Sequence, residues 1–169
     1  MLLENGSSST INNVSIRNCD EYAVRSDSYF EMTDCNIYDN SGSAVWCSTF
    51  FELTNCNIFD NAGFAFLVVP SLINLNFYET ANSWNNGHCN AIYLMSGSIP
   101  ESVVWQNEYQ FVIGGVVTVP DGVSLMIEEG SIFKFTEGDT RIDVSGGLIA
   151  EGTAADHIYF TSYADDSIR

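Results

Sequence analysis

The sequence predicts an all-β fold, a parallel β-helix in which short coils stack along one axis. The first observation is a repeated segment, because residues 35–45 (CNIYDNSGSAV) recur as residues 56–66 (CNIFDNAGFAF). The second is the spacing, since Ile16, Ile37 and Ile58 follow one another at intervals of 21 residues. A repeat of this length cannot bury a core alone and must stack on its neighbours. Alternating apolar and polar residues between Asn- and Gly-rich turns indicate strands rather than helices.

The first block of coils is predicted to span residues 10–95. The short strands of one coil cannot pair with one another, so each strand pairs with its equivalent in the next coil, about 4.8 Å away. Equivalent residues then form ladders along the axis. The predicted ladders are an amide ladder of Asn40 and Asn61 and an apolar ladder of Phe30, Phe51 and Leu72.

The next coil is stretched. Residues 84–92 align with residues 58–66 at an offset of 26 rather than 21, which predicts a loop of additional residues around positions 78–83. Insertions into a solenoid form loops on one face, where ligands often bind. Trp84, beside this loop, is therefore a candidate ligand-binding residue. A tryptophan buried in the core is the alternative.

A second block of coils is predicted after a connector. Residues 96–107 interrupt the repeat and contain glycine and proline, which predicts the connector. Residues 108–169 form the second block, and its equivalent residues lie 25 positions apart: Val117 with Ile142, and Phe135 with Phe160. We expect the two blocks to stack end to end as a single β-helix domain of residues 1–169, because separate blocks would each leave open sheet edges.

Charge limits the partners of the chain. It carries 5 Lys and Arg against 22 Asp and Glu, a net charge of −17. This disfavours nucleic acid, whose phosphates are bound by basic side chains, and also anionic membranes and free polyanionic polysaccharides. No apolar run reaches the roughly 18 residues of a membrane span. The first residues lack the basic and apolar regions of a signal peptide, so we expect any export signal to lie outside this chain.

The five cysteines include no C-x-x-C pair, which gives no indication of a zinc or redox site. Cys35 and Cys56 lie one repeat apart, so their Cα atoms are expected within disulfide range on neighbouring coils. Buried free thiols that act as small apolar side chains are the favoured reading.

An aromatic column is the main candidate binding surface. If Ile37 points into the core, then Tyr38 points outward, and Phe59 occupies the same position one coil later. Arg17 lies one coil earlier in the same column, where its guanidinium can lie over a ring. Flat aromatic columns suit sugar rings and protein contacts. The alternative is a column covered by a loop or a neighbouring molecule.

Stacked carboxylates are the main candidates for chemistry. Asp39 and Asp60 lie one coil apart, so a shared proton or a bound calcium ion would relieve their repulsion, and two carboxylates at such a distance also occur in glycoside hydrolases. Aspartates that cap turns are the alternative. Apart from this calcium ion, no cofactor is expected. His88 and His157 have no partner at metal-ligand or catalytic spacing.

Residues 14–66 resemble the repeats shared by pectate lyases, polygalacturonases, mannuronan epimerases and many large bacterial surface proteins. Residues 105–162, with VTVPDGVSL at 117–125 and LIAEGT at 148–153, resemble a non-catalytic segment of secreted or surface-anchored bacterial β-helix proteins. These resemblances imply a right-handed parallel β-helix with coils of about 21–26 residues. They also imply an extracellular or cell-surface location.

The preferred functional hypothesis is a non-enzymatic scaffold or adhesion segment with a polysaccharide as candidate ligand. The alternative is a partial or degenerate polysaccharide-active enzyme, a lyase or glycoside hydrolase, of the same fold. Lyases that this chain resembles use a basic residue, whereas one coil after Arg17 and Arg25 stand Tyr38 and Trp46. The open coil ends or the aromatic column would also allow a homodimer.

Overall fold

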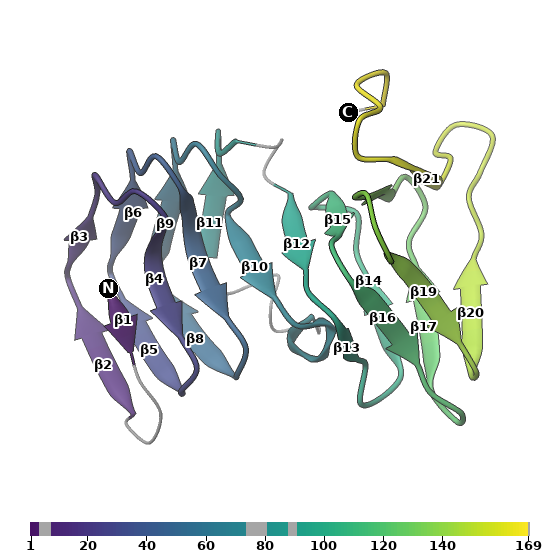
Figure 1. Ribbon diagram of the computed structural model, residues 1–169, viewed down its shortest axis with the longest axis horizontal. Coiled ribbons are helices and arrows are strands. Elements are labelled where there is room, and N and C mark those ends of the chain that lie inside the picture. The colour runs from purple at the N-terminus through teal and green to yellow at the C-terminus, as the bar shows by residue number, and fades with distance from the viewer. Residues whose placement is uncertain (4–7, 74–80, 88–90, 169) are drawn as a thin grey trace. The chain divides into compact units, whose positions relative to one another are not determined.

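The computed structural model describes residues 1–3, 8–73, 81–87 and 91–168, and for residues 81–84 it describes the backbone alone. Nearly every element is a β-strand (Figure 1). In the described part of the chain, the 3₁₀ helix η1 (Pro70–Leu72) is the one helix, and no helix is long and apolar enough to cross a membrane. The chain is therefore all-β, as predicted.

The chain divides into two compact units. Unit 1 comprises Met1–Val68 and Tyr78–Ile92, and unit 2 comprises Val69–Phe77 and Tyr93–Arg169. The expectation that two blocks stack end to end as a single domain stays a prediction.

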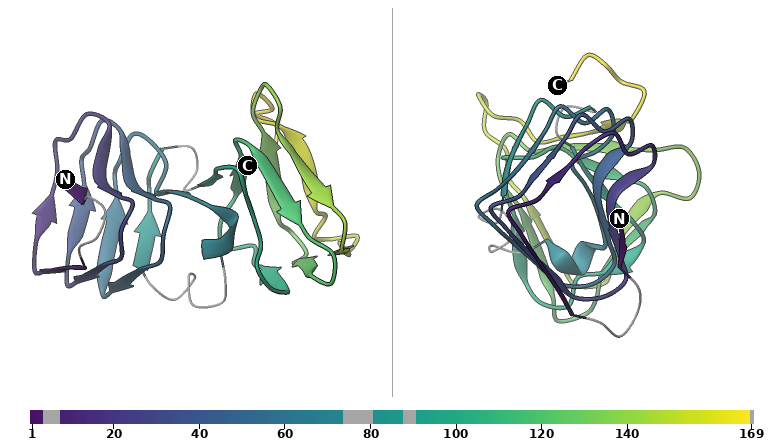
Figure 2. Two further views of the ribbon diagram at one scale, coloured as in Figure 1. Left: turned by 60° about the horizontal axis from the view of Figure 1, so that its bottom comes forward. Right: turned by 90° about the vertical axis from the view of Figure 1, so that its left-hand side faces the viewer.

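Unit 1 is built from three parallel sheets, whose neighbouring strands come from successive coils (Figure 2). The sheets are β2-β5-β8, β3-β6-β9-β11 and β1-β4-β7-β10. The strands are β1 (Leu2–Leu3), β2 (Ser9–Asn12), β3 (Ser15–Ile16), β4 (Tyr22–Ser26), β5 (Phe30–Thr33), β6 (Asn36–Tyr38), β7 (Ser43–Cys47), β8 (Phe51–Thr54), β9 (Cys56–Phe59), β10 (Phe66–Val68) and β11 (Ala81–Trp84). This arrangement is the predicted solenoid.

The register in unit 1 confirms the 21-residue period. Ile16 pairs with Ile37, which pairs with Ile58, and the stacked rings of Phe30 and Phe51 have centroids 5.4 Å apart. Leu72 does not continue the Phe30 ladder as predicted. It lies in η1, a helix that begins with proline, and not in a strand. The thiols of Cys35 and Cys56 are buried and free, the favoured reading.

A buried amide ladder holds the coils of unit 1 in register. The Nδ2 atom of Asn40 donates to Oδ1 of Asn61, and Nδ2 of Asn61 donates to Oδ1 of Asn86, both at 2.7 Å. The three side chains are at most 7% exposed. Each Nδ2 also donates to the main-chain oxygen of an isoleucine in the preceding coil. The sequence predicted Asn40 and Asn61, and the structure adds Asn86.

The stretched coil differs from its prediction. Strand β11 pairs with β9 so that Trp84 lies opposite Phe59, an offset of 25 and not 26. Positions 81–83, expected in a loop, therefore lie in a strand, while positions 78–80 of that loop lie outside the described residues. The physical reason is the amide ladder, because the offset of 25 places Asn86 on Asn61.

Unit 2 is also built from parallel sheets, in which β13-β16-β19 and β14-β17-β20 form two and β15-β18-β21 contributes to a third. The strand β12 (Ile92–Leu94) begins in unit 1 and ends in unit 2. The other strands are β13 (Gly97–Ser98), β14 (Val103–Trp105), β15 (Phe111–Ile113), β16 (Val116–Val119), β17 (Ser124–Ile127), β18 (Ile132–Phe135), β19 (Arg141–Val144), β20 (Gly147–Ala150) and β21 (Tyr159–Ser162). An aromatic cluster of Trp105, Phe111 and Phe133 fills the core, with ring centroids 5.1–5.9 Å apart.

Two predictions for unit 2 are wrong. Residues 96–107 are not a plain connector, because they contain β13 and β14, which pair with β16 and β17. Phe160 pairs with Phe133 and not with Phe135, because the stack on the buried ring of Phe133 decides the register and the turn before β21 takes up the additional residues. The expected pairing of Val117 with Ile142 is confirmed.

A loop after β21 lies against the outer side of β18. Lys134 Nζ donates to the main-chain oxygen of Asp165 at 2.6 Å. The Asp165 carboxylate accepts from Thr161 Oγ1 at 2.6 Å and from the main-chain N–H of Ser167 at 2.9 Å. Hydrogen bonds from Ser167 and Thr161 lower the pKa of Asp165 from 3.8 to about 2.

Replacement of a ladder asparagine should destabilise unit 1. Asn61→Ala removes the buried side-chain hydrogen bonds that join Asn61 to Asn40 and to Asn86, so we expect the free energy of unfolding to fall by about 2–3 kcal/mol. Urea unfolding measures this change. Asn12→Ala, at an exposed strand position, is the control and should change stability by less than about 0.5 kcal/mol. Equal losses in the two variants would contradict the ladder.

The loop after β21 should loosen in acid. The pKa of Asp165 is lower in the folded chain, so its ionised form stabilises the loop above pH 3.8, and this contribution is lost as the pH falls to about 2. NMR shifts of the Ser167 amide should follow that titration. Asp165→Asn should show the loosened spectrum at neutral pH, whereas Asp166→Asn should not. A pKa near 3.8 for Asp165 would contradict this account.

Candidate functional site

The outer face of sheet β3-β6-β9-β11 carries a stack of aromatic rings. Ile37 and Ile58 are fully buried, so the alternation of a strand turns Tyr38 and Phe59 to the other side. These two side chains are half-buried, and their rings stack with centroids 5.0 Å apart and planes at 1°. The spacing between paired strands sets this distance and places one ring flat on the next.

Arg17 and Trp84 extend this stack in opposite directions. The exposed Arg17 follows β3, and its Cζ atom lies 6.0 Å from the centroid of the Tyr38 ring, at the outer limit of a cation–π contact. Trp84 is the backbone partner of Phe59, although its side chain lies outside the described part. We call Arg17, Tyr38 and Phe59, with Trp84 next to them by register, the Tyr38 column.

A second cation–aromatic contact lies on sheet β1-β4-β7-β10. The Cζ atom of Arg25 is 4.9 Å from the ring centroid of Trp46, and the Tyr22 ring lies 6.4 Å from that of Trp46. In the sequence, Trp46 stands one coil after Arg25, which counts against a repeated basic site. The structure instead brings the two side chains together, and their spacing of 21 residues was the signal for this contact.

Asp39 and Asp60 occupy equivalent turns next to the Tyr38 column. Both have a positive φ, 52° and 53°, a conformation that aspartate and asparagine tolerate better than most residues. Asn85 takes the same conformation one coil later, and its Nδ2 donates to Oδ1 of Asp60. This geometry accounts for both carboxylates as turn residues.

A metal or catalytic role of these carboxylates stays a prediction. Among the described residues, no three His, Cys, Asp or Glu side chains converge on one point. His157 is exposed, with its ring 6.1 Å from that of Tyr159, and His88 lies outside the described residues.

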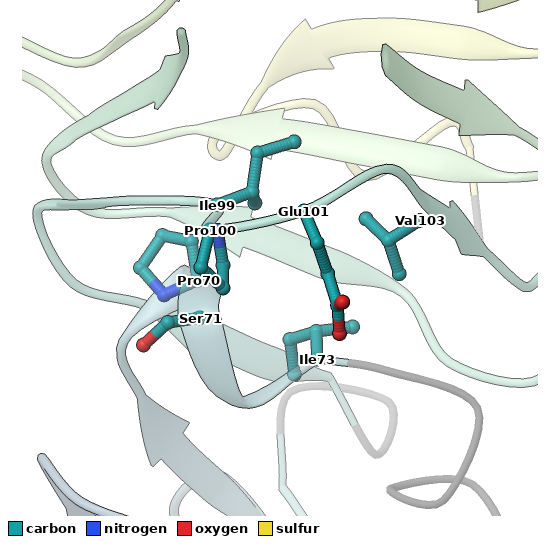
Figure 3. A pocket seen from close by; sticks show the side chains of 7 residues that line it. All are labelled: Pro70, Ser71, Ile73, Ile99, Pro100, Glu101 and Val103. Carbon is teal, nitrogen blue, oxygen red and sulfur yellow. The ribbon is translucent and has the colours of Figure 1, made fainter. Parts of the chain in front are cut away.

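Described residues of unit 2 line two surface hollows. The one in Figure 3 lies between η1 and the segment that joins β13 to β14, and Pro70, Pro100 and the side chain of Glu101 line it. Its volume of about 10 Å³ holds roughly one water molecule. The other is wide and open, beside Asp156 and His157. Neither hollow contains a residue of the Tyr38 column.

The comparisons with known proteins agree with the fold. A family model described as a right-handed beta helix region matches residues 1–108. No curated protein and no solved structure matches the chain.

The cation–π contact at the top of the column should be measurable as a coupling. In a double-mutant cycle with Arg17→Ala and Tyr38→Ala, we expect about 0.5–1 kcal/mol of coupling in the free energy of unfolding, because the contact is exposed. A cycle with Arg17→Ala and Met126→Ala, which belong to different units, should give none. A coupling below about 0.3 kcal/mol in the first cycle would contradict the contact.

Proposed function

We propose that the chain is a non-enzymatic scaffold or adhesion segment that binds carbohydrate at the Tyr38 column. The chain belongs to the right-handed beta helix region family, and this membership is the starting point of the proposal. The fold itself supports a scaffold-type or polysaccharide-related role. An extracellular or cell-surface location, with the segment part of a bacterial protein, belongs to the same proposal.

One observation carries the carbohydrate part of the proposal. Tyr38 and Phe59 form parallel, half-buried rings at the strand spacing on an outer sheet face. The face of a sugar ring is flat and carries C–H groups, so it packs on an aromatic face much as another ring does. The guanidinium of Arg17 adds fixed hydrogen-bond donors at one end of the column. The column thus combines an apolar platform with polar groups that can orient a ligand.

The charge of the chain favours a neutral polysaccharide. A net charge of −17 opposes a polyanion, and Arg17 is the one basic side chain in contact with the column among the described residues. A neutral glycan avoids this repulsion and still gains the ring contacts. The enzyme alternative has no observation in its favour among the described residues.

Self-association through the coil ends stays a prediction. Strands β1 and β21 expose Leu2 (58%) and Phe160 (48%). Sedimentation of the intact chain tests it.

A glycan array, with and without calcium, tests the carbohydrate proposal. The intact chain should bind a defined neutral glycan, and Tyr38→Ala/Phe59→Ala should lose at least about 90% of the signal, because loss of each aromatic platform costs roughly 1 kcal/mol or more.

Met126→Ala is the matched control, since Met126 is an exposed apolar residue (42%) of strand β17. This variant should retain the binding. Silence of the intact chain on the whole array, or an equal loss in the control, would contradict the proposal. A calcium requirement that Asp39→Asn removes would support the metal prediction for the turn aspartates.

A further inference from the structure

Another aromatic pair lies directly before strands β5 and β8. The rings of Tyr29 and Phe50 stack with centroids 5.9 Å apart and planes at 11°, and Phe50 is 50% exposed. Two residues later, Glu31 and Glu52 are directly paired across β5 and β8. We call these four residues the acidic aromatic corner. They share no residue with the Tyr38 column, so a ligand here is independent of the proposed carbohydrate ligand.

The polar groups of the corner converge on the Tyr29 hydroxyl. This hydroxyl donates to Oε1 of Glu31 at 2.8 Å. Partial burial, followed by the hydrogen bond to Glu31 and the charges of Glu31 and Glu52, raises the pKa of Tyr29 from 10.0 to about 12. Glu31 thus contacts the phenol directly, and its strand partner Glu52 comes from the same position of the next coil, beside the exposed ring of Phe50.

The negative charge of the corner is not balanced within the described chain. Two carboxylates directly opposite each other on neighbouring strands repel. All four described basic residues are engaged elsewhere: Arg17 on Tyr38, Arg25 on Trp46, Lys134 on the Asp165 oxygen, and Arg141 on Asp139 and Asp143. A cation from another molecule would relieve this repulsion.

Two half-buried aromatic groups of unit 1, the Tyr38–Phe59 stack and Trp46 with Tyr22, show what kind of cation fits. In each of them an arginine from the preceding coil, Arg17 or Arg25, lies over a ring of the next coil. At the corner the position 21 residues before Tyr29 is Ser8, which is too short to cover a ring. The corner therefore has aromatic rings like the other two groups and two carboxylates in addition, but no arginine from the preceding coil lies over its rings.

We propose that the acidic aromatic corner binds an arginine side chain of a basic partner polypeptide. A guanidinium is planar, so it can stack on the rings of Tyr29 and Phe50 and donate from its edge to Glu31 and Glu52. A calcium ion would use only the carboxylates and needs six to eight oxygen ligands. A second copy of the chain has no disengaged basic side chain to offer in its described part, which favours a different polypeptide.

Titration of a short arginine peptide tests the proposal. The probe is acetyl-Gly-Arg-Gly-Arg-Gly-amide, added to the intact chain at low salt and followed by NMR and calorimetry. Glu52→Gln and Phe50→Ala should each weaken binding about fivefold, since one removes a charged acceptor and the other half of the ring platform. Both positions are exposed, so the fold should survive, as circular dichroism will show.

Control variants separate the corner from the general acidity of the chain. Glu137→Gln removes an exposed carboxylate of unit 2, and Met126→Ala removes an exposed apolar side chain. Both should bind the probe within about twofold of the original chain, apart from a small loss from net charge. A loss in Glu137→Gln equal to that in Glu52→Gln would overturn the proposal, because the attraction would then be non-specific.

Two further measurements bear on the ligand and on the geometry. The same peptide with lysine in place of arginine, and spermidine, should bind more weakly because neither has a planar guanidinium. Equal binding of spermidine would overturn the assignment to arginine. Glu52→Gln should also lower the pKa of Tyr29 from about 12 towards 10.0 in an ultraviolet titration. An unchanged pKa would show that Glu52 does not face the phenol and would overturn the site.

Discussion

The structure depends on one constraint, which is that no strand in the described part of the chain pairs with another strand of its own coil. Every pairing joins a residue to its equivalent in a neighbouring coil, such as Phe30 to Phe51 in unit 1 or Phe111 to Phe133 in unit 2. The backbone groups of one coil are therefore satisfied only if the next coil is present. As a direct result, side chains at equivalent positions of successive coils lie one strand spacing apart.

This spacing has different consequences inside and outside the coils. Inside, it selects buried apolar side chains that stack on one another, such as Ile37 and Ile58, or amides that hydrogen-bond to one another, such as Asn40 and Asn61. Outside, the same geometry lays rings flat on rings and an arginine over the first ring. The strand pairing that aligns the core thus also aligns the side chains of the candidate surfaces.

Much of the fold could be predicted from the sequence, because period 21 and alternation within strands are visible in it. Arg17, Tyr38 and Phe59 of the Tyr38 column followed from these two regularities alone, whereas the place of Trp84 next to them did not. The predicted register was wrong where the spacing between coils changes. Trp84 was aligned by the similarity of the residues that follow it, whereas the buried hydrogen bond between Asn61 and Asn86 decides the pairing. The contact of Arg25 with Trp46 was missed because the two residues were compared as substitutes and not as neighbours.

The amide ladder also bears on how such a chain can change its length in evolution. Insertion or loss of one complete repeat would move each asparagine onto its next equivalent and leave every ladder intact. A change of any other size must leave the ladder positions aligned, and the coil between β9 and β11 meets this condition with an offset of 25, at which Asn86 still meets Asn61. A whole repeat can therefore be gained or lost without disturbing the core, whereas a smaller insertion or deletion must fit between two ladder positions.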